Sequence, residues 1–337
     1  MASLVPLVET TRGGTRECVH FGALAVADTQ GRVLAHAGDP HWLTFTRSTL
    51  KPLQALPFVQ GGGVQRFGLT PANLAMLCAS HSGEPMHVEQ VEDILGKAGV
   101  DHRRLQCGCH VPLFADLGVA PAPAAESYDE RHHNCSGKHS GFLAWCVQHG
   151  QPLESYLEPG HPLQQAIRGA VAEAVGLQEQ QLAMGIDGCS APNYAMPLSH
   201  LARGFARLAS GTRDAVLGES FECLAQAMTA HPELVSGTAR NDQAFMQAGR
   251  GDWVTKVGAD GVQVVASRSR GEALALKVSD GNAFALHAAT VEALDQLGWL
   301  DDAQREALRP WRRAVLTSVR GAPVGERKAV FRLAVPA

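Results

Sequence analysis

The sequence predicts an α+β fold in which one antiparallel sheet is built from both ends of the chain and a mainly helical segment is inserted between them. Strand patterns occur near both termini, whereas helical periodicity dominates the middle. The two sets of strands are expected to bury their apolar faces in one shared sheet. We expect a single domain over residues 1–337, with a sheet lobe formed by 1–45 and 250–337 and a mainly helical lobe over 46–249.

The individual elements follow from the spacing of apolar residues. Two alternating runs, Val19 to Ala27 and Arg32 to His36, flank a turn at Asp28 to Gly31 and predict a hairpin. Helical spacing predicts helices at about 49–59, 86–98, 136–149, 162–175, 198–209 and 213–230. Strands are expected at about 253–257, 261–268 and 272–278, helices at about 283–297 and 302–319, and an edge strand from Lys328 to Val335.

Composition and charge exclude several classes of function. The 337 residues are 45% hydrophobic and 18% charged, which is enough to bury a large core. A net charge of -4 provides no basic field for nucleic acid or an anionic membrane. The segment from Met1 to Glu9 lacks the basic start and long apolar region of a signal peptide, so we expect a cytoplasmic protein with reduced thiols.

Two cysteine segments carry the clearest chemical signal. They are Asn134 to Ser140, which reads Asn-Cys-Ser-Gly-Lys-His-Ser, and Gly185 to Pro192, which reads Gly-Ile-Asp-Gly-Cys-Ser-Ala-Pro. If Cys135 opens a helical turn, Lys138 and His139 share its face, and Cys189 arrives from a separate loop. Thiolates with a nitrogen ligand suit zinc. Chemistry alone leaves a metal site and a reactive-thiol site open, and it favours His139 as the nitrogen ligand.

The other cysteines have simpler interpretations. Four of them occur in apolar contexts and are expected to be small buried hydrophobes: Cys18, Cys78, Cys146 and Cys223. The cluster from Cys107 to His110 is spaced too tightly for a Cys-x-x-Cys clamp, so we do not expect it to bind a metal.

A second signal is the Ser-x-x-Lys pattern of Ser48 and Lys51. On the first turn of a helix these side chains share one face, and Pro52 is tolerated only in such a first turn. A desolvated lysine can lose its proton and activate a serine. Two further elements are expected nearby, the Ser-His-Ser-Gly-Glu segment that starts at Ser80 and the strand that carries Lys256 in Lys-Val-Gly.

Ser-x-x-Lys followed late in the chain by Lys-x-Gly is the order found in serine β-lactamases and penicillin-binding proteins. A closer resemblance covers about residues 8 to 335. The motifs Arg-Ser-Thr-x-Lys-Pro, Ser-His-Ser-Gly-Glu, Asn-Cys-Ser-Gly-Lys-His-Ser-Gly and Gly-x-Asp-Gly-Cys-x-x-Pro resemble the signatures of the bacterial class 3 L-asparaginases. This is a zinc-containing asparaginase II family with a serine β-lactamase-like fold.

The resemblance implies three groups of site residues and a homodimer. Two Ser-Lys tandems would be catalytic, formed by Ser48 with Lys51 and by Ser80 with Lys256. The ligands of Zn²⁺ would be Cys135, Lys138 and Cys189. The residues near the small-molecule substrate would be Arg47, His139 and Asp187.

The expected reaction is hydrolysis of L-asparagine to L-aspartate and ammonia through an acyl-enzyme on a serine. Which serine attacks, whether zinc is catalytic or orienting, and whether asparagine or glutamine is preferred are left open. Two alternatives share parts of the pattern: a β-lactamase or penicillin-binding-type serine acyltransferase, and a non-enzymatic zinc-binding protein in which Cys135 and Cys189 join two lobes.

Overall fold

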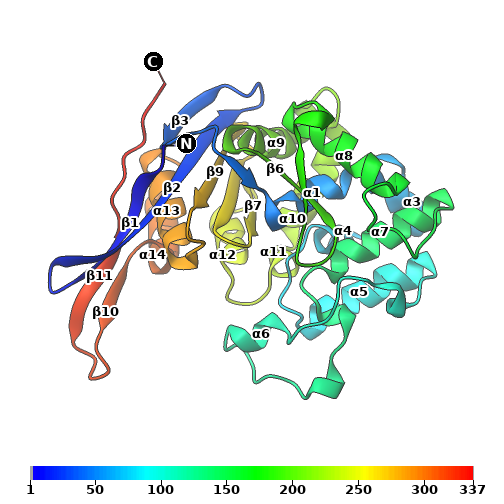
Figure 1. Ribbon diagram of the computed structural model, residues 1–337, viewed down its shortest axis with the longest axis horizontal. Helices are drawn as coiled ribbons and strands as arrows, with labels where there is room; N and C mark the ends of the chain where they lie inside the picture. The colour runs from blue at the N-terminus through cyan, green and yellow to red at the C-terminus, as the bar shows by residue number, and fades with distance from the viewer. Residues whose placement is uncertain (1–2, 337) are drawn as a thin grey trace.

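The computed structural model describes residues 3–336, so the first two residues and the last residue of the predicted domain lie outside the described residues. Its main sheet is antiparallel, in the order β10-β11-β1-β2-β9-β8-β7, with β3 also paired to β2. The strands are β1 (Val5–Arg12), β2 (Thr15–Asp28), β3 (Val33–Ala37), β7 (Trp253–Gly258), β8 (Val262–Ser267), β9 (Glu272–Val278), β10 (Ala314–Thr317) and β11 (Pro323–Ala329). The predicted α+β class, with a sheet built from both termini, is confirmed (Figure 1).

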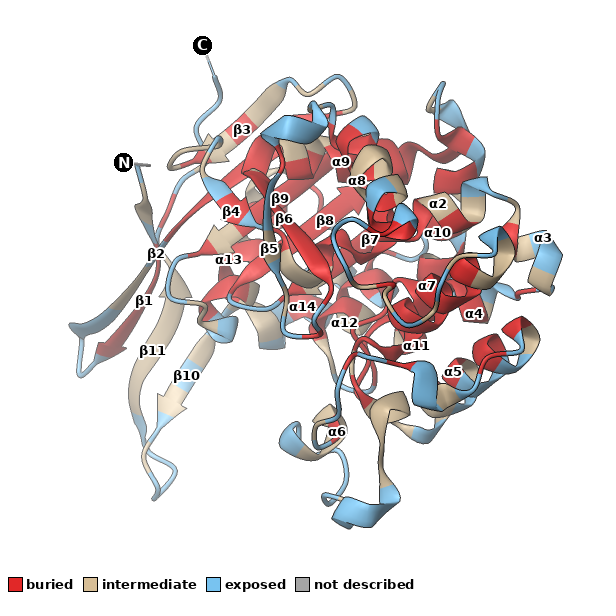
Figure 2. Cartoon of the chain, turned by 45° about the vertical axis from the view of Figure 1, so that its right-hand side comes forward, coloured by how far each residue is buried: buried red, intermediate tan, exposed pale blue. Residues whose placement is uncertain are grey.

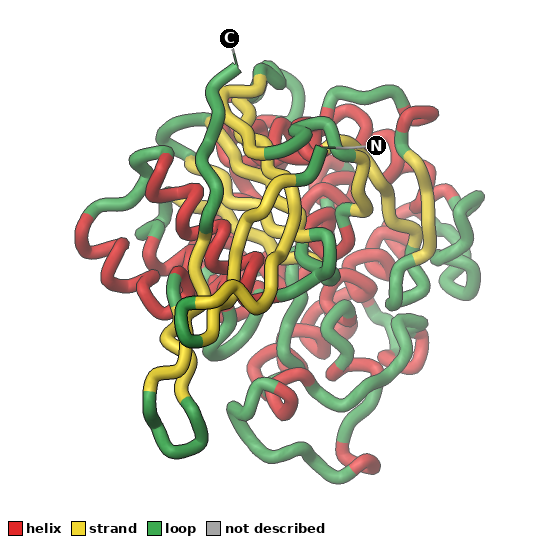
Figure 3. Tube along the Cα trace, turned by 60° about the vertical axis from the view of Figure 1, so that its left-hand side comes forward, coloured by secondary structure: helices red, strands yellow, loops and turns green. Residues whose placement is uncertain are grey.

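The long strand β2 shows why both faces of the sheet are covered. The residues from Ala23 to Ala27 are all apolar and buried, and successive side chains point to opposite faces. Ala23 and Ala25 join the larger core with helix α9 (Leu198–Ser210), whereas Leu24 and Val26 join a second core with helices α13 (Ala283–Gln296) and α14 (Asp302–Arg312). Helices therefore lie on both sides of the sheet (Figure 3).

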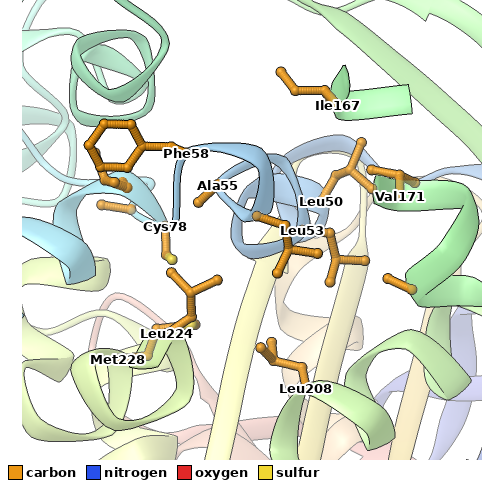
Figure 4. Close-up of a cluster of buried hydrophobic side chains, with 14 of the residues drawn as sticks. Leu50, Leu53, Ala55, Phe58, Cys78, Ile167, Val171, Leu208, Leu224 and Met228 are labelled. Atoms are coloured by element: carbon orange, nitrogen blue, oxygen red, sulfur yellow. The ribbon is translucent and has the colours of Figure 1, made fainter. Parts of the chain in front are cut away.

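The chain between the two sets of strands is mainly helical, as predicted. Besides α9, its helices are α1 (Lys51–Gln54), α2 (Leu56–Gln60), α3 (Gly63–Phe67), α4 (Pro71–Leu77), α5 (Pro85–Ala98), α6 (Leu113–Asp116), α7 (Ser136–His149), α8 (Pro162–Val175), α10 (Gly218–Ala230), α11 (Pro232–Val235) and α12 (Asn241–Ala248). The predictions for α5, α7 and α8 agree with the structure to within one residue. The larger core joins α1, α8, α9 and α10, as Leu53, Val171, Leu208 and Leu224 illustrate (Figure 4).

Several predicted elements differ from the structure. The helix expected at 49–59 is divided into the 3₁₀ turn η1 (Arg47–Leu50), α1 and α2, because Pro52 and Pro57 lack a backbone N–H and each lie in the first turn of a new helix. The helix expected at 302–319 ends at Arg312, shortly after Pro310, and the chain continues as β10.

The prediction of an edge strand over 328–335 was wrong in both bounds and place. Strand β11 ends at Ala329 and lies between β1 and β10, so that β10 forms the edge. A small second sheet in the order β4-β6-β5 was not predicted; it contains β4 (Leu43–Phe45), β5 (Ala183–Ile186) and β6 (Pro192–Pro197).

Burial is greatest where the sheet meets the helical segment, whereas the segment around α6 is mostly exposed or half-buried (Figure 2). Across residues 3–336, no helix combines the length and apolar character that a bilayer crossing requires.

Candidate active site

The side chain of Ser80 lies between two buried lysines. The Nζ atom of Lys51 is 2.9 Å from Ser80 Oγ, and the Nζ atom of Lys256 is 3.0 Å from the same oxygen. All three residues are at most 3% exposed. Ser80 follows α4, Lys51 begins α1, and Lys256 lies on β7, so the site forms where the sheet meets the helical segment.

Each lysine also faces oxygen atoms that only accept hydrogen bonds. Lys51 donates to the carbonyl oxygens of Ala79 (2.5 Å) and Asn134 (3.1 Å). Lys256 donates to the carbonyl oxygen of Val257 (2.9 Å). A neutral amine that keeps its N–H groups on these acceptors turns its lone pair toward Ser80, which is the geometry a proton acceptor needs.

Burial favours the neutral form of both lysines. It lowers the pKa of Lys256 to about 7, although the Asp242 carboxylate acts in the opposite direction. Burial also lowers the pKa of Lys51. Near neutral pH, Lys256 can therefore both accept and release a proton.

Ser48 is placed differently from what the resemblance implied. It is half-buried in η1, and among residues 3–336 it is joined to Lys51 only through the backbone, by a hydrogen bond from the Lys51 N–H to the Ser48 carbonyl oxygen, whereas the Lys51 amine makes none to the Ser48 hydroxyl. The resemblance implied one Ser-Lys pair of Ser48 with Lys51 and another of Ser80 with Lys256. In the structure, the amine of Lys51 instead contacts Ser80, so both lysines share one serine. Lys256 does contact Ser80, as expected.

Two glycines of the predicted motifs permit close backbone packing around this site. A Cβ atom on Gly258 would lie 2.9 Å from the carbonyl oxygen of Thr46, and one on Gly137 would lie 2.3 Å from that of Met76. The first contact brings β7 against η1, and the second brings α7 against α4. Larger residues at these positions would separate the elements that carry the lysines, Ser80 and the cysteine cluster.

The cysteine segments also converge. Cys135, the N-cap residue of α7, lies beside Cys189 from the loop between β5 and β6, and Lys138 Nζ is 3.0 Å from Cys189 Sγ. A hydrogen bond from Cys135, reinforced by Lys138, holds the pKa of Cys189 well below its usual range. Burial opposes a charge on Lys138, but the adjacent Cys189 thiolate outweighs it and raises the pKa of Lys138.

His139 adds an unpaired nitrogen to this cluster. It is fully buried, and its Nδ1 atom lies 2.7 Å from the hydroxyl of Tyr156. Its Nε2 atom is buried and makes no hydrogen bond with the part of the chain that the structure describes. Burial lowers the pKa of His139 to about 4, so the ring is neutral and can offer a lone pair.

A charged pair borders the site on the solvent side. Arg47 Nε donates to Asp187 Oδ1 at 2.9 Å, and both side chains are partly exposed. Arg47 has a positive φ of 50°, a conformation that costs energy for a residue with a side chain. Asn193 holds it there, accepting from the Arg47 N–H and donating to its carbonyl oxygen, each at 3.0 Å.

The family-model description "L-asparaginase II" matches residues 8–329, nearly the whole chain. The chain belongs to the L-asparaginase II family. Membership in this family places it among the amidohydrolases. No curated protein matched the sequence. Among solved structures, the chain is similar to a β-lactamase from Mycobacterium bovis, with 16% sequence identity and a TM-score of 0.40 over 82% of this chain and 94% of that one.

The donor set of this family member fits a zinc ion only if a lysine is one of the ligands. Among residues 3–336, no group of three or more His, Cys, Asp or Glu side chains is arranged to hold a metal. Cys135 and Cys189 supply two soft ligands, Lys138 supplies an amine in contact with one of them, and the unpaired Nε2 of His139 points to a missing partner. Lys138 would have to lose its proton to bind a metal.

The remaining cysteines agree in part with the interpretation from sequence. Cys78 and Cys146 are buried, but Cys18 is exposed because the first half of β2 extends beyond the covered part of the sheet. Cys223 is only half-buried. In the cluster from Cys107 to His110, Cys107 is buried and Cys109 is exposed, so the two thiols face different surroundings.

Sequence reasoning missed two polar residues that hold the site together. Asn193 fixes the backbone of Arg47, and the fully buried Asp242 lies 3.5 Å from Lys256 Nζ. Neither belongs to a motif with a known spacing. The only signal available for Asp242 was a carboxylate at the start of the short helical segment Asn241–Ala248, which precedes the Lys256 strand.

Proposed function

We propose that the chain hydrolyses the side-chain amide of L-asparagine to L-aspartate and ammonia, with Ser80 as the nucleophile. The observation that carries this proposal is the position of Ser80 Oγ, at 2.9 Å and 3.0 Å from the amines of Lys51 and Lys256. Two buried amines can share the work that a histidine does in other serine hydrolases, one accepting the serine proton and the other stabilising negative charge.

The reaction would proceed in two steps. In the first, a neutral lysine takes the proton of Ser80, and Ser80 Oγ attacks the amide carbon. The same lysine then gives the proton to the departing ammonia, which leaves a β-aspartyl ester on Ser80. In the second step, water attacks this ester while the lysine acts again as general base, and L-aspartate is released. Burial of both lysines supports the neutral form that the first step needs.

Arg47 and Asp187 are proposed to bind the charged end of the substrate. L-asparagine carries an α-carboxylate and an α-ammonium group, and the partly exposed pair of Arg47 and Asp187 offers one complementary charge to each. His139 lies deeper, next to the cysteine cluster, and its buried position supports a role in orienting that cluster as well as the substrate.

Cys135, Lys138 and Cys189 are proposed to hold Zn²⁺, whereas His139 lies beside this cluster without being one of the proposed ligands. A bound zinc ion supplies a Lewis acid, which can polarise or orient a carbonyl group. To hold the ion, Cys135 would have to lose its proton, because its hydrogen bond to Cys189 and its burial raise the pKa of the Cys135 thiol. Lys51 connects this cluster to Ser80 through the carbonyl oxygen of Asn134.

The zinc proposal predicts about one zinc ion per chain in protein purified without chelator, since a structural or catalytic zinc site holds one ion. We expect Cys135→Ser and Cys189→Ser to lose most of it, because each removes one of two thiolate ligands. Elemental analysis of the purified variants measures this directly. Cys109→Ser is the matched control, an exposed cysteine outside the cluster. Zinc that survives in both cluster variants and is lost from Cys109→Ser would place the metal elsewhere.

The proposed activity predicts ammonia release from L-asparagine that exceeds hydrolysis of a β-lactam. Ammonia release from L-asparagine and L-glutamine and the opening of a β-lactam ring should be measured side by side, with and without a chelator. A chain that opens the β-lactam but releases no ammonia would be a serine acyltransferase of the penicillin-binding type. A chain inactive on all three that still binds zinc would be a binding protein. The homodimer and the cytoplasmic location stay predictions.

A further inference from the structure

Asp242 is a buried carboxylate whose contacts converge on the strand that carries Lys256. It lies in the first turn of α12 and is fully buried. Its Oδ2 atom accepts a hydrogen bond from the Val257 N–H at 2.8 Å and lies 3.5 Å from Lys256 Nζ. Its Oδ1 atom accepts from the Thr255 hydroxyl at 3.1 Å and from Gln263 Nε2 at 3.0 Å. A buried charge persists only where it is paired and hydrogen-bonded in this way.

These contacts fix the direction of the Lys256 amine. The amine faces three oxygens: the carbonyl of Val257, the carboxylate of Asp242 and the hydroxyl of Ser80. The first two can only accept hydrogen bonds; the Val257 carbonyl accepts one from the amine, and the Asp242 carboxylate lies at ion-pair distance, so N–H groups of the amine face both. The remaining position of the amine, which is a lone pair when Lys256 is neutral, faces Ser80. Lys51 has two carbonyl acceptors instead, those of Ala79 and Asn134.

We propose that Asp242 is a positioning residue that orients the Lys256 amine toward Ser80 and sets the strength of that amine as the base for the Ser80 proton. The inference rests on the proposed function of Ser80 and Lys256. It distinguishes the two lysines, because the counter-ion of Lys256 is a buried carboxylate, whereas burial of Lys51 is opposed by the sulfur atoms of Cys135 and Cys189. Burial alone would weaken Lys256 as a base, and the carboxylate restores part of its basicity.

The sign of the pH effect follows from these two opposing influences. Burial lowers the pKa of Lys256 to about 7, and Asp242 raises it against that trend. Three other charged or titratable groups face Lys256. Lys51 on α1 and Arg240, the residue before α12, lower the pKa of Lys256, whereas Cys135, at the start of α7, raises it. In the wild type, the reactivity of Ser80 should rise with pH through about 7 as Lys256 becomes neutral.

The test compares Asp242→Asn with Thr255→Val. Asp242→Asn removes the charge of the carboxylate at nearly constant shape. In a plot of reaction rate against pH, we expect the rising limb to move to lower pH, because the pKa of Lys256 falls. The plateau rate should fall about tenfold or more, since a weaker base transfers the proton less effectively. Thr255→Val removes one hydrogen bond to the same carboxylate but keeps its charge, and its limb should stay near that of the wild type. If Asp242→Asn does not fold, Asp242→Ser takes its place in the test, because the smaller serine side chain leaves room for water.

Two readouts separate this inference from the proposed function. The first is the pH dependence of ammonia release from L-asparagine, and the second is the pH dependence of Ser80 acylation by a fluorophosphonate probe, followed by mass spectrometry. A shifted limb in the acylation rate supports the role of Asp242 even if L-asparagine proves not to be a substrate. A limb and plateau unchanged in both Asp242 variants would overturn the inference. So would an equal shift in Thr255→Val, because it would reflect loosened packing instead of the lost charge.

Discussion

The Ser80→Ala variant is expected to lose a factor of about a thousand or more in turnover of L-asparagine while it keeps its fold. Removing the nucleophile of a serine hydrolase leaves only binding and electrostatic stabilisation, and such losses are commonly of this size or larger. The serine hydroxyl is small and its contacts are with the two lysines, so the fold should tolerate the methyl group of alanine. Ammonia release at saturating substrate, together with a thermal melt of each protein, measures both parts of the expectation.

Ser48→Ala is the matched control for this experiment. Both serines belong to predicted motifs, but Ser48 is half-buried in η1, and among the described residues its hydroxyl has no hydrogen bond to the Lys51 amine. We expect Ser48→Ala to cost less activity than Ser80→Ala. An inactive Ser48→Ala beside a nearly normal Ser80→Ala would reverse the assignment and restore the pairing of Ser48 with Lys51 that the resemblance implied.

The second large effect is expected at the lysines. Lys51→Met and Lys256→Met each remove a buried amine in contact with Ser80, and each should lower turnover by a factor of about 100 to 10,000, the range for loss of a general acid–base group. The double variant should be little worse than the more damaged single variant, because residues that act as one unit do not contribute additively. Steady-state ammonia release from the three variants measures this.

Arginine should not replace either lysine. A guanidinium group stays protonated in proteins, so Lys51→Arg and Lys256→Arg keep a positive charge but cannot accept the Ser80 proton. Lys97→Met on α5 is a suitable control, since Lys97 is partly exposed and pairs with Asp93 away from Ser80. Substantial activity in Lys51→Arg together with Lys256→Arg would remove lysine as the base. The first alternative to examine would then be His81, the buried residue that follows Ser80 and whose ring lies 2.9 Å from the Ser136 hydroxyl.

Local patterns predicted the long elements well, because one segment contains the whole signal. The helices α5, α7 and α8 each combine apolar spacing with a clear end, and a glycine follows the last residue of each. Short strands such as β4 and β10 could not be predicted, since three or four residues carry little periodicity. Their pairing depends on distant strands that no local pattern identifies.

The candidate site was predicted in its residues but not in all of its contacts. The motif containing Ser48 and Lys51 suggested that the two side chains interact, because they are three residues apart. The structure instead has Lys51 directed into the interior, where Ser80 and the carbonyl oxygen of Asn134 arrive from other elements. Contacts of this kind depend on tertiary packing, and so does the contact between Asp242 and Lys256. The sequence could name the chemical groups, whereas their partners required the fold.

The central claim is that Ser80 forms a covalent ester with the substrate, and trapping that ester tests it most directly. Wild-type protein mixed with L-asparagine should be quenched in acid within the first turnover, digested and mapped by mass spectrometry. The proposed mechanism predicts a β-aspartyl ester on the peptide that contains Ser80, and its absence in Ser80→Ala. An ester on the peptide that contains Ser48 would contradict this mechanism. So would the release of ammonia with no ester on any peptide, in a sample quenched before the intermediate can be hydrolysed.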